Sequence, residues 1–306
     1  MYNIAVIITG GTIASDKQDN YISLNNTKSR YKILELFSQK YPERNSEIRF
    51  DISSPYTILS ENLSGNHINT LIKNVKEILS NEKKYDGVII THGTDTLQYS
   101  AAALAICLSD IKIPVMLVSS NYILDDNRAN GLMNFAQAVE YITACDMSGI
   151  YVSYDGSILD GFTLLPHIPY SDKIYALGQS DDLSKEKPKK YLMPEDLSFD
   201  DITLTNTSPI LYLRAVPGQI FPKLDGTDIK AVLLETYHSG TLGTDSRELR
   251  EFCENACLYK IPIYVVGVKE RTQYESTSLY TSLNLKVMPK ISPIAAYMFL
   301  WFKYSN

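Results

Sequence analysis

The sequence predicts an α/β protein, with a doubly wound, mostly parallel sheet in an N-terminal domain and a smaller α/β domain after it. Two observations support this prediction. Short, continuous, β-branched runs such as Ile4–Ile8 and Val88–Ile90 are typical of strands buried on both faces of a parallel sheet. Segments with helical spacing of apolar residues alternate with these runs across residues 1–160. That alternation is typical of a parallel sheet covered by helices on both faces.

The elements of the N-terminal domain are expected where the apolar pattern changes its period. Strands are predicted from continuous apolar runs, at Ile4–Ile8, Ile48–Ile52, Val88–Ile90, Ile113–Val118 and Ile150–Ser153. Helices are predicted from apolar residues that recur on one side, at Ser29–Lys40, His67–Leu79, Leu97–Ser109 and Leu132–Thr143. The polar stretch Asp16–Thr27 follows the first strand and its turn, and we expect a mobile loop there that closes over a site.

A change of composition separates the two predicted domains. From Gln179 to Asp200 the chain is charged, contains proline and lacks apolar periodicity, which is typical of a linker. We therefore predict an N-terminal domain over residues 1–180, a linker over 181–201 and a C-terminal domain over 202–306. In the C-terminal domain, strands and helices are expected at Lys230–Thr236, Ser246–Leu258, Ile261–Val268 and Ser292–Tyr304.

Length, charge and hydropathy restrict the class of protein. The chain has 306 residues, 44% of them hydrophobic, and a formal net charge of −6. This length allows two cores, and the lack of a basic excess argues against nucleic acid as a partner. No window of about eighteen apolar residues indicates a membrane span, and the start, Met1–Gly11, lacks the charged segment of a secretory signal. We expect a soluble, cytoplasmic protein.

Neither the cysteines nor the histidines have the spacing of a metal site. The four cysteines form no CxxC pair, and they are Cys107, Cys145, Cys253 and Cys257. The four histidines are scattered, at positions 67, 92, 167 and 238. Cys253 and Cys257 lie four apart on a predicted helix, where small buried packing is the commoner role. We expect no metal and no cofactor, and free thiols suit a reducing compartment.

Chemically capable side chains follow two of the predicted strands directly. Thr91–Thr96, THGTDT, comes after Val88–Ile90, and Thr9–Ser15, TGGTIAS, comes after Ile4–Ile8. Ligands of open α/β sheets bind outside the carboxyl ends of strands, so each turn is a candidate site. Glycine lets backbone N–H groups approach a ligand closely, as an oxyanion hole requires. The alternative is that these hydroxyl and carboxylate groups only cap the following helix.

The two turns together carry a resemblance to a known family. GGTIAS (Gly10–Ser15) and THGTDT (Thr91–Thr96), about eighty residues apart, resemble the two signature motifs of the bacterial L-asparaginase/glutaminase family, which uses threonine nucleophiles. Further segments follow in the family's order: PYTILSENL (55–63), SSNYILDDNRANGLMNF (119–135), ETYHSGT (235–241), YES (274–276) and SPIAAY (292–297). The resemblance thus extends over nearly the whole chain.

This resemblance implies roles for the N-terminal residues. Thr12 matches the attacking hydroxyl, Thr94 the second essential threonine, and Tyr21 the tyrosine that assists proton transfer. Asp95 and Glu61 match residues that hold the substrate ammonium, and a carboxylate suits that partner. Ser60 matches a donor to the substrate carboxylate, and the resemblance implies that backbone N–H groups around Gly11 and Thr94 receive the oxyanion. His92 matches a structural position, and it is not expected to be the base.

Two residues of the C-terminal domain match positions that in this family reach the site of a neighbouring subunit. They are Thr241 in YHSGT and Glu275 in YES. The resemblance therefore implies a homodimer or homotetramer. From the residues alone, ordinary turns after apolar strands remain the alternative.

The chain departs from the family pattern at one position. Many members have a lysine that pairs with the second threonine, and Pro166 stands there, with His167 beside it and Lys173 seven residues on. A lysine would ease deprotonation of Thr94. Three interpretations stay open: a branch that works without the lysine, a substitute role for His167 or Lys173, or a protein that binds an amide without hydrolysing it well.

The function expected from these observations is hydrolysis of L-asparagine, with L-glutamine as a further substrate. The reaction is expected to release ammonia through an acyl-threonine intermediate. One alternative is the ammonia-supplying subunit of an amidotransferase. Another is a catalytically weak protein that binds or senses an amino-acid amide.

Overall fold

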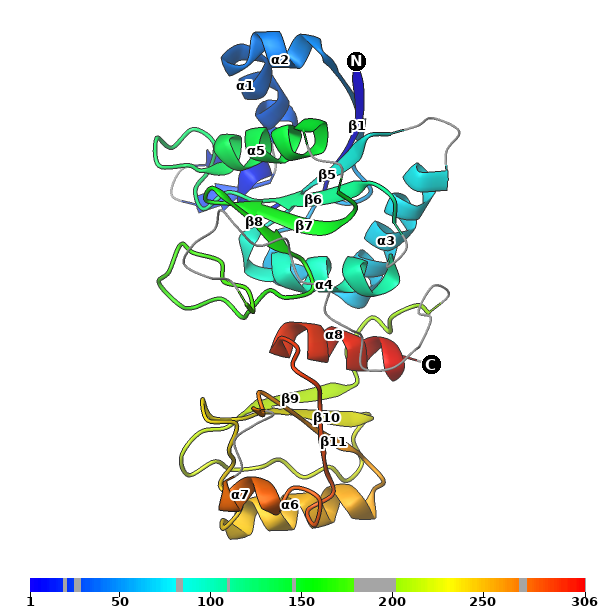
Figure 1. Ribbon diagram of the computed structural model, residues 1–306, viewed down its shortest axis with the longest axis vertical. Coiled ribbons are helices and arrows are strands. Elements are labelled where there is room, and N and C mark those ends of the chain that lie inside the picture. Colours follow the sequence, from blue (N-terminus) through cyan, green and yellow to red (C-terminus); the bar gives the residue numbers. More distant parts are fainter. Residues whose placement is uncertain are drawn as a thin grey trace. The chain divides into compact units, whose positions relative to one another are not determined.

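Six strands of the N-terminal part form one sheet. Their order is β4 (Ile48–Ser53), β1 (Tyr2–Ile8), β5 (Gly87–Thr91), β6 (Pro114–Val118), β7 (Gly149–Tyr154) and β8 (Ser157–Asp160). All neighbours are parallel except β7 and β8, which form a hairpin. The predicted doubly wound, mostly parallel sheet is confirmed (Figure 1).

The computed structural model describes residues 1–18, 21–24, 29–80, 85–108, 111–144, 147–178, 202–269 and 274–305. Two compact units are present, residues 1–189 and 190–306, and each is described by itself. The predicted linker, residues 181–201, and Cys145 lie outside the described residues. The exact domain boundary therefore stays a prediction.

Helices cover both faces of this sheet. On one face lie α1 (Lys32–Lys40), α2 (Pro42–Ser46) and α5 (Gly131–Ala144), and on the other lie α3 (Gly65–Ser80) and α4 (Leu97–Cys107) (Figure 1). The core under α1 and α5 includes Phe37 and Phe135, whose ring centroids are 5.4 Å apart. Because both sheet faces are covered, every residue from Ile4 to Ile8 is buried, which explains the continuous apolar run in the sequence.

The order of the strands places a topological switch between β1 and β5. From β1 the chain passes through α1 to β4 on one side, and from β5 it passes through α4 to β6 on the other side. The two connections therefore diverge at the carboxyl ends of β1 and β5. Open α/β sheets bind ligands at such a point.

The stretch after the first turn differs from the prediction. Asp16–Thr27 was expected to be a mobile loop, but β2 (Asp16–Gln18) pairs antiparallel with β3 (Tyr21–Ser23). Residues 19–20 and 25–28 lie outside the described residues. The expectation was wrong for the two strands because a short ribbon is held by backbone pairing, which polar side chains do not reveal.

The second unit is a smaller α/β domain, as predicted. Its parallel sheet has the order β12 (Leu285–Val287), β11 (Ile263–Val266), β10 (Ala231–Glu235) and β9 (Ile210–Arg214). The helix α6 (Arg247–Leu258) packs Leu249 and Phe252 into the core of this sheet. The buried helix α8 (Pro293–Lys303) contacts β9 and β10, and a short helix, α7 (Glu275–Ser278), precedes β12.

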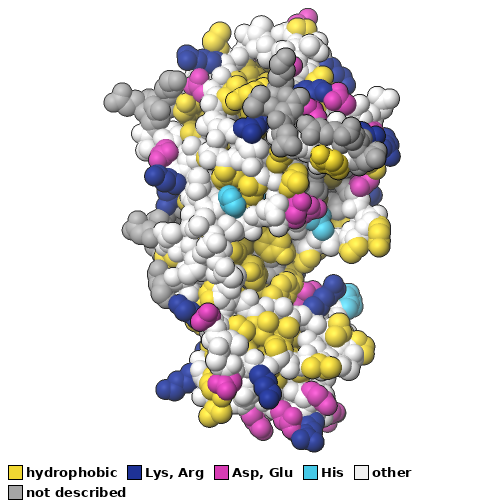
Figure 2. All heavy atoms as spheres, turned by 180° about the vertical axis from the view of Figure 1, so that it is seen from behind, with side chains coloured by type: hydrophobic (Ala, Val, Ile, Leu, Met, Phe, Trp, Pro, Cys, Tyr) yellow, Lys and Arg dark blue, Asp and Glu magenta, His cyan; other side chains and the backbone are white. Residues whose placement is uncertain are grey.

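Positively and negatively charged side chains are mixed on the surface and do not form separate patches. Figure 2 shows Lys and Arg interspersed with Asp and Glu on the face that it draws. Ion pairs such as Lys73 with Glu77, 3.8 Å apart, are largely exposed, and exposed pairs contribute less than about 1 kcal/mol each. Stability therefore depends mainly on the buried apolar residues. Among the described residues, no helix combines the length and the apolar character needed to cross a bilayer.

The aromatic contact between α1 and α5 can be tested by truncation. Phe37 is fully buried, so Phe37→Ala is expected to lower the free energy of unfolding by about 3–5 kcal/mol. Urea unfolding followed by circular dichroism measures this change. As a control on α5, Met133→Ala removes a side chain that is 45% exposed and should cost less than about 1 kcal/mol. Equal losses in the two variants would contradict this account of the core.

Candidate active site

The first turn of the site follows β1. Gly10 and Gly11 have φ angles of 110° and 74°, which favour glycine, and Thr12 begins the short 3-10 helix η1 (Thr12–Ala14). The turn is tied to a neighbouring segment: Gly11 N donates to Ile58 O at 2.9 Å, and Ile58 N donates to Thr9 O at 3.0 Å. Thr12 is half-buried. The strand, the two glycines and this pairing together fix where the Thr12 side chain begins.

The second turn follows β5 and touches the first. Thr94 begins the 3-10 helix η4 (Thr94–Thr96), which leads directly into α4. A Cβ atom at Gly11 would lie 2.2 Å from Gly93 Cα, so the two backbones are in direct contact. No side chain fits between them. The structure therefore brings together the two threonine turns that the sequence singled out.

A third segment packs against Gly93. Ser60 begins the 3-10 helix η3 (Ser60–Asn62) and is 4% exposed. A Cβ atom at Gly93 would lie 2.4 Å from Ser60 Oγ, and Thr96 Oγ1 donates to Ser60 O at 2.8 Å. Glu61, the next residue, is exposed. Ser60 and Glu61 thus lie on the segment that contacts the second threonine turn.

The hydroxyl of Thr94 has a defined partner. Thr94 Oγ1 donates to Ser120 O at 3.2 Å, and Ser120 follows β6, the strand next to β5. The proton of this hydroxyl is committed to a carbonyl, so its lone pairs remain available. A half-buried hydroxyl in that state can accept a further hydrogen bond.

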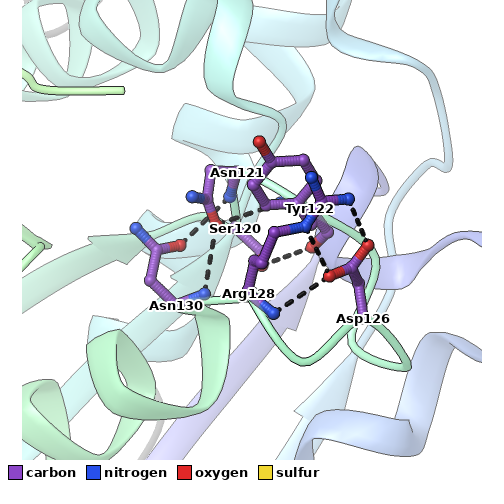
Figure 3. Close-up of polar contacts among 6 residues, drawn as sticks. All are labelled: Ser120, Asn121, Tyr122, Asp126, Arg128 and Asn130. Atoms are coloured by element: carbon purple, nitrogen blue, oxygen red, sulfur yellow. Dashed lines mark hydrogen bonds and ion pairs between the residues drawn. The ribbon is translucent and has the colours of Figure 1, made fainter. Parts of the chain in front are cut away.

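The loop that carries Ser120 is braced by reciprocal hydrogen bonds (Figure 3). Asn121 N donates to Asn130 Oδ1 at 3.0 Å, and Asn130 N donates to Asn121 Oδ1 at 3.1 Å. Ser120 Oγ donates to Tyr122 O at 2.6 Å and accepts from Gly131 N at 3.1 Å. The carbonyl that holds Thr94 is therefore itself fixed.

An ion pair stabilises the outer part of the same loop. Arg128 binds Asp126 through two bonds, Nε to Oδ1 at 2.9 Å and Nη2 to Oδ2 at 2.7 Å. Its guanidinium carbon lies 4.0 Å from the ring centroid of Tyr122. Hydrogen bonds from Arg128 lower the pKa of Asp126 to about 2. These residues were not expected individually from the sequence, although a cluster of Asn, Asp and Ser directly after a strand is the signal that points to such a braced loop.

His92 supports the second turn from inside. It is 2% exposed, with Nδ1 2.8 Å from Gly93 O and Nε2 2.9 Å from Ser100 Oγ. A carbonyl oxygen only accepts, so Nδ1 carries the proton and Nε2 accepts from Ser100. Burial lowers the pKa of His92. A neutral imidazole with both nitrogens occupied suits a bracing role better than that of a general base.

A second histidine contacts the turn from a different segment. His167 Nε2 lies 2.7 Å from Thr94 O, and both groups are half-buried. His167 directly follows Pro166, which stands where the resembled family often has lysine. Lys173, the other residue considered for that role, is exposed. Of these two, the structure therefore brings the histidine to Thr94.

Tyr21 and Asp95 are less constrained than the turns. Tyr21 lies on β3, is 61% exposed, and has no recorded contact with Thr12 among the described residues. Asp95 is exposed on η4, and its carbonyl accepts from Gln98 Nε2 at 3.3 Å. The Asp95 carboxylate is thus open to a solute. The roles expected for both residues stay predictions.

Thr241 and Glu275 belong to the second unit. Thr241 follows β10 and is half-buried, and its carbonyl accepts from Tyr237 N at 3.0 Å. Glu275 is exposed at the first position of α7. No described feature tests the role expected for either residue at a neighbouring subunit's site.

The expected oxyanion donors are backbone N–H groups around Gly11 and Thr94, and Gly11 itself already has a partner. Its N–H donates to Ile58 O, so it is already occupied and is not a free donor for an oxyanion. Thr12 and Thr94 each begin a 3-10 helix, where the first N–H has no partner within the helix. These two N–H groups suit the oxyanion better than that of Gly11.

The contact between the turns can be tested with two glycines of similar φ. Gly11 (φ 74°) would place a Cβ atom against Gly93, whereas Gly156 (φ 77°) has open space around it. Gly156→Ala should cost about 1–2 kcal/mol from backbone strain alone. Gly11→Ala should cost at least about 2 kcal/mol more because of the overlap. Urea unfolding measures both, and equal costs would contradict the contact.

The buried state of His92 predicts a pH dependence of stability. The pKa of His92 is lowered in the folded protein, so below about pH 6.5 the unfolded chain binds a proton that the folded chain does not. The free energy of unfolding should then fall with decreasing pH, at up to about 1.4 kcal/mol per pH unit for this group.

His92→Gln should remove this part of the pH slope, and urea unfolding between about pH 7 and 5 measures the difference. An NMR titration of the wild-type imidazole provides an independent check. Protonation of His92 at its ordinary pKa would contradict the buried neutral state.

Comparison with known proteins identifies the relatives of this chain. A family model described as "Asparaginase, N-terminal" matches residues 3–165. Among curated relatives, a glutamyl-tRNA(Gln) amidotransferase subunit of Archaeoglobus fulgidus is 36% identical over 165 residues, 53% of this chain and 37% of that protein. The protein of the same name from Thermofilum pendens is 30% identical over 159 residues, 52% of this chain and 34% of that protein. The matches thus span little more than a third of these relatives.

Two solved structures share the fold along the chain. The thermostable L-asparaginase from Thermococcus kodakarensis has a TM-score of 0.74 at 20% identity, over 99% of this chain and 93% of that one. L-asparaginase I from Vibrio cholerae has a TM-score of 0.73 at 20% identity, over 100% and 93%. Identities this low show the fold alone. The family model, however, covers more than half of the chain and includes both threonine turns, so the chain belongs to the asparaginase family.

Proposed function

We propose that this protein hydrolyses L-asparagine to L-aspartate and ammonia through a threonine acyl-enzyme, with L-glutamine as a further substrate. The observation that carries the proposal is the contact of two threonine turns, through Gly11 and Gly93, at the switch between β1 and β5. Membership of the asparaginase family supports amide hydrolysis as the class of reaction. The substrate has to be argued from the site itself.

The proposed reaction begins at Thr12. Its Oγ attacks the side-chain amide carbon of the substrate, and the hydroxyl proton passes toward the leaving nitrogen with the help of Tyr21. The C–N bond then breaks, ammonia leaves, and an ester joins Thr12 to the acyl group. Water hydrolyses this ester, which releases L-aspartate and restores the hydroxyl. No metal or cofactor is needed for these steps.

Thr94 serves the same reaction as an acceptor in this proposal. Its hydroxyl proton is directed at Ser120 O, so its lone pairs can accept a hydrogen bond from the attacking water. The oxyanion of each tetrahedral intermediate needs donors already in place. The N–H groups of Thr12 and Thr94 are the donors that we assign to it.

The amino-acid end of the substrate is assigned to the segment next to Gly93. The exposed carboxylates of Glu61 and Asp95 suit an α-ammonium group. Ser60, buried against Gly93, is assigned to the α-carboxylate as a hydroxyl donor. Binding of both the α-ammonium and the α-carboxylate group would fix the orientation of a free amino acid.

Assembly into a homodimer or homotetramer is part of the proposal. Thr241 and Glu275 are assigned to the site of a neighbouring subunit on the strength of their match to the family motifs. Both lie at polar positions that follow apolar strands of the second unit. A soluble, cytoplasmic enzyme for a small metabolite is the setting that we infer.

A second candidate function is ammonia supply within an amidotransferase. The observation that favours it is the name of the curated relatives, which are glutamyl-tRNA(Gln) amidotransferase subunits at 36% and 30% identity. A protein with this role would bind further protein partners. Ammonia release from L-asparagine by the chain alone favours the hydrolase, whereas release that needs a partner protein favours the supply role.

The two threonines provide the direct test. Thr12→Ala and Thr94→Ala should each lower ammonia release from L-asparagine by about 10³-fold or more, because each removes a hydroxyl used in the chemical steps. A coupled assay for ammonia measures turnover on L-asparagine and L-glutamine. Thr70→Ala is a matched control, since Thr70 is exposed on α3 and its hydroxyl donates to Asn66 O, and it should leave turnover unchanged.

Two results would overturn the hydrolase proposal. One is turnover that survives in both site variants. The other is a wild-type protein that releases no ammonia while L-asparagine still raises its melting temperature, which would instead support a protein that binds an amino-acid amide.

A further inference from the structure

We propose that His167 is a positioning residue that holds the Thr94 turn through its carbonyl, and this inference rests on the function proposed above. The contact joins His167 Nε2 to Thr94 O at 2.7 Å. It links two segments 73 residues apart in the sequence. This contact is not a helix cap, because His167 belongs to neither η4 nor α4 nor to the residues next to them.

The hydrogen bond fixes the tautomer of His167. Thr94 O can only accept, so Nε2 must carry the proton. The neutral imidazole then leaves Nδ1 as an acceptor. A doubly protonated ring keeps the Nε2 donor as well, so the hold on Thr94 O does not require a particular charge.

His167 lies in a segment, residues 163–177, whose two ends are joined by backbone hydrogen bonds. Leu164 pairs with Ala176 in an isolated bridge, Leu165 N donates to Tyr175 O at 2.8 Å, and Leu177 N donates to Thr163 O at 2.9 Å. Pro166, within the tied segment, has a restricted φ and no N–H group. The backbone before His167 is therefore stiff, which lowers the entropy lost on placing the ring.

Thr94 is held from two directions as a result. Its hydroxyl donates to Ser120 O at 3.2 Å, and its carbonyl accepts from His167 Nε2 at 2.7 Å. Ser120 comes from the β6 to α5 connection, and His167 from the chain after β8. Loss of the histidine would leave the carbonyl of η4 without this donor and allow the hydroxyl to shift. A shift of about 1 Å in a reacting group can cost roughly 10²-fold in rate.

The experiment compares two substitutions of His167. The amide N–H of glutamine reaches about as far as Nε2, so His167→Gln should keep the kcat for L-asparagine within about three-fold of wild type. His167→Leu lacks a donor, and its kcat should fall about 10- to 100-fold, more than KM changes. Lys173→Leu is the control on the same segment, because Lys173 is exposed, and it should leave kcat and KM unchanged.

Imidazole ¹⁵N spectra of the wild-type protein provide a readout that does not depend on activity. We expect the shifts of His167 to show a protonated Nε2. The amide resonances of residues 93–96 should shift in His167→Leu and much less in His167→Gln. If the wild type releases no ammonia, the proposed function fails, while these spectra still decide whether His167 holds the turn.

Three outcomes would overturn the inference. A protonated Nδ1 with a bare Nε2 would exclude the hydrogen bond. Wild-type kcat in His167→Leu would show that the contact has no effect on the reaction. An equal loss in both variants, with the acid limb of the pH profile removed, would make His167 an acid or base in its own right.

Discussion

The contact between Gly11 and Gly93 is the constraint on which the site depends. Parallel strands β1 and β5 are neighbours, so their carboxyl ends would be close in any case, but an added Cβ atom at Gly11 would lie only 2.2 Å from Gly93 Cα. This backbone contact places the turns of Thr12 and Thr94 side by side. Ser60 packs against Gly93, so three segments far apart in the sequence meet at this glycine. At Gly93 there is room for a hydrogen atom but not for a side chain. The requirement for glycine is thus mutual, and a side chain at either position would push the turns apart.

Residues of the site that lie close to the sheet are held by more hydrogen bonds than those farther from it. Thr94 is held by a carbonyl from the loop after β6, and reciprocal bonds between Asn121 and Asn130 hold that loop. The residue before η4, Gly93, is hydrogen-bonded to the buried His92. Both ring nitrogens of His92 have partners inside the protein. By contrast, Tyr21 lies on a two-stranded ribbon and is 61% exposed. In the proposed mechanism, the two threonines therefore lie on rigid elements, whereas the tyrosine assigned to proton transfer lies on an exposed ribbon that can adapt.

The sequence was sufficient for the fold because buried parallel strands leave a strong pattern. Ile4–Ile8 and Val88–Ile90 are continuous apolar runs since helices cover both faces, and most predicted elements lie within a few residues of the observed ones. Short elements were missed: α2, α7 and β12 are too brief for periodicity to detect. The strand β9 was also missed, although it is as long as β5. The β2 and β3 ribbon was missed because backbone pairing forms it. The tie between Gly11 N and Ile58 O, and that between His167 and Thr94, join distant segments, which no local pattern records.

The kind of contact that His167 makes has a consequence for which threonine attacks. A cation beside a hydroxyl lowers the energy of the alkoxide, but the imidazole of His167 binds the carbonyl of Thr94 and not its hydroxyl. The hydroxyl proton of Thr94 is directed at Ser120 O, a neutral acceptor that cannot remove it. Thr94 is therefore poorly placed to become an alkoxide and well placed to remain a hydroxyl that accepts. Thr12 lies on the first turn and takes part in neither of these hydrogen bonds. We therefore assign the attack on the amide to Thr12, and a hydrogen bond to the attacking water to Thr94.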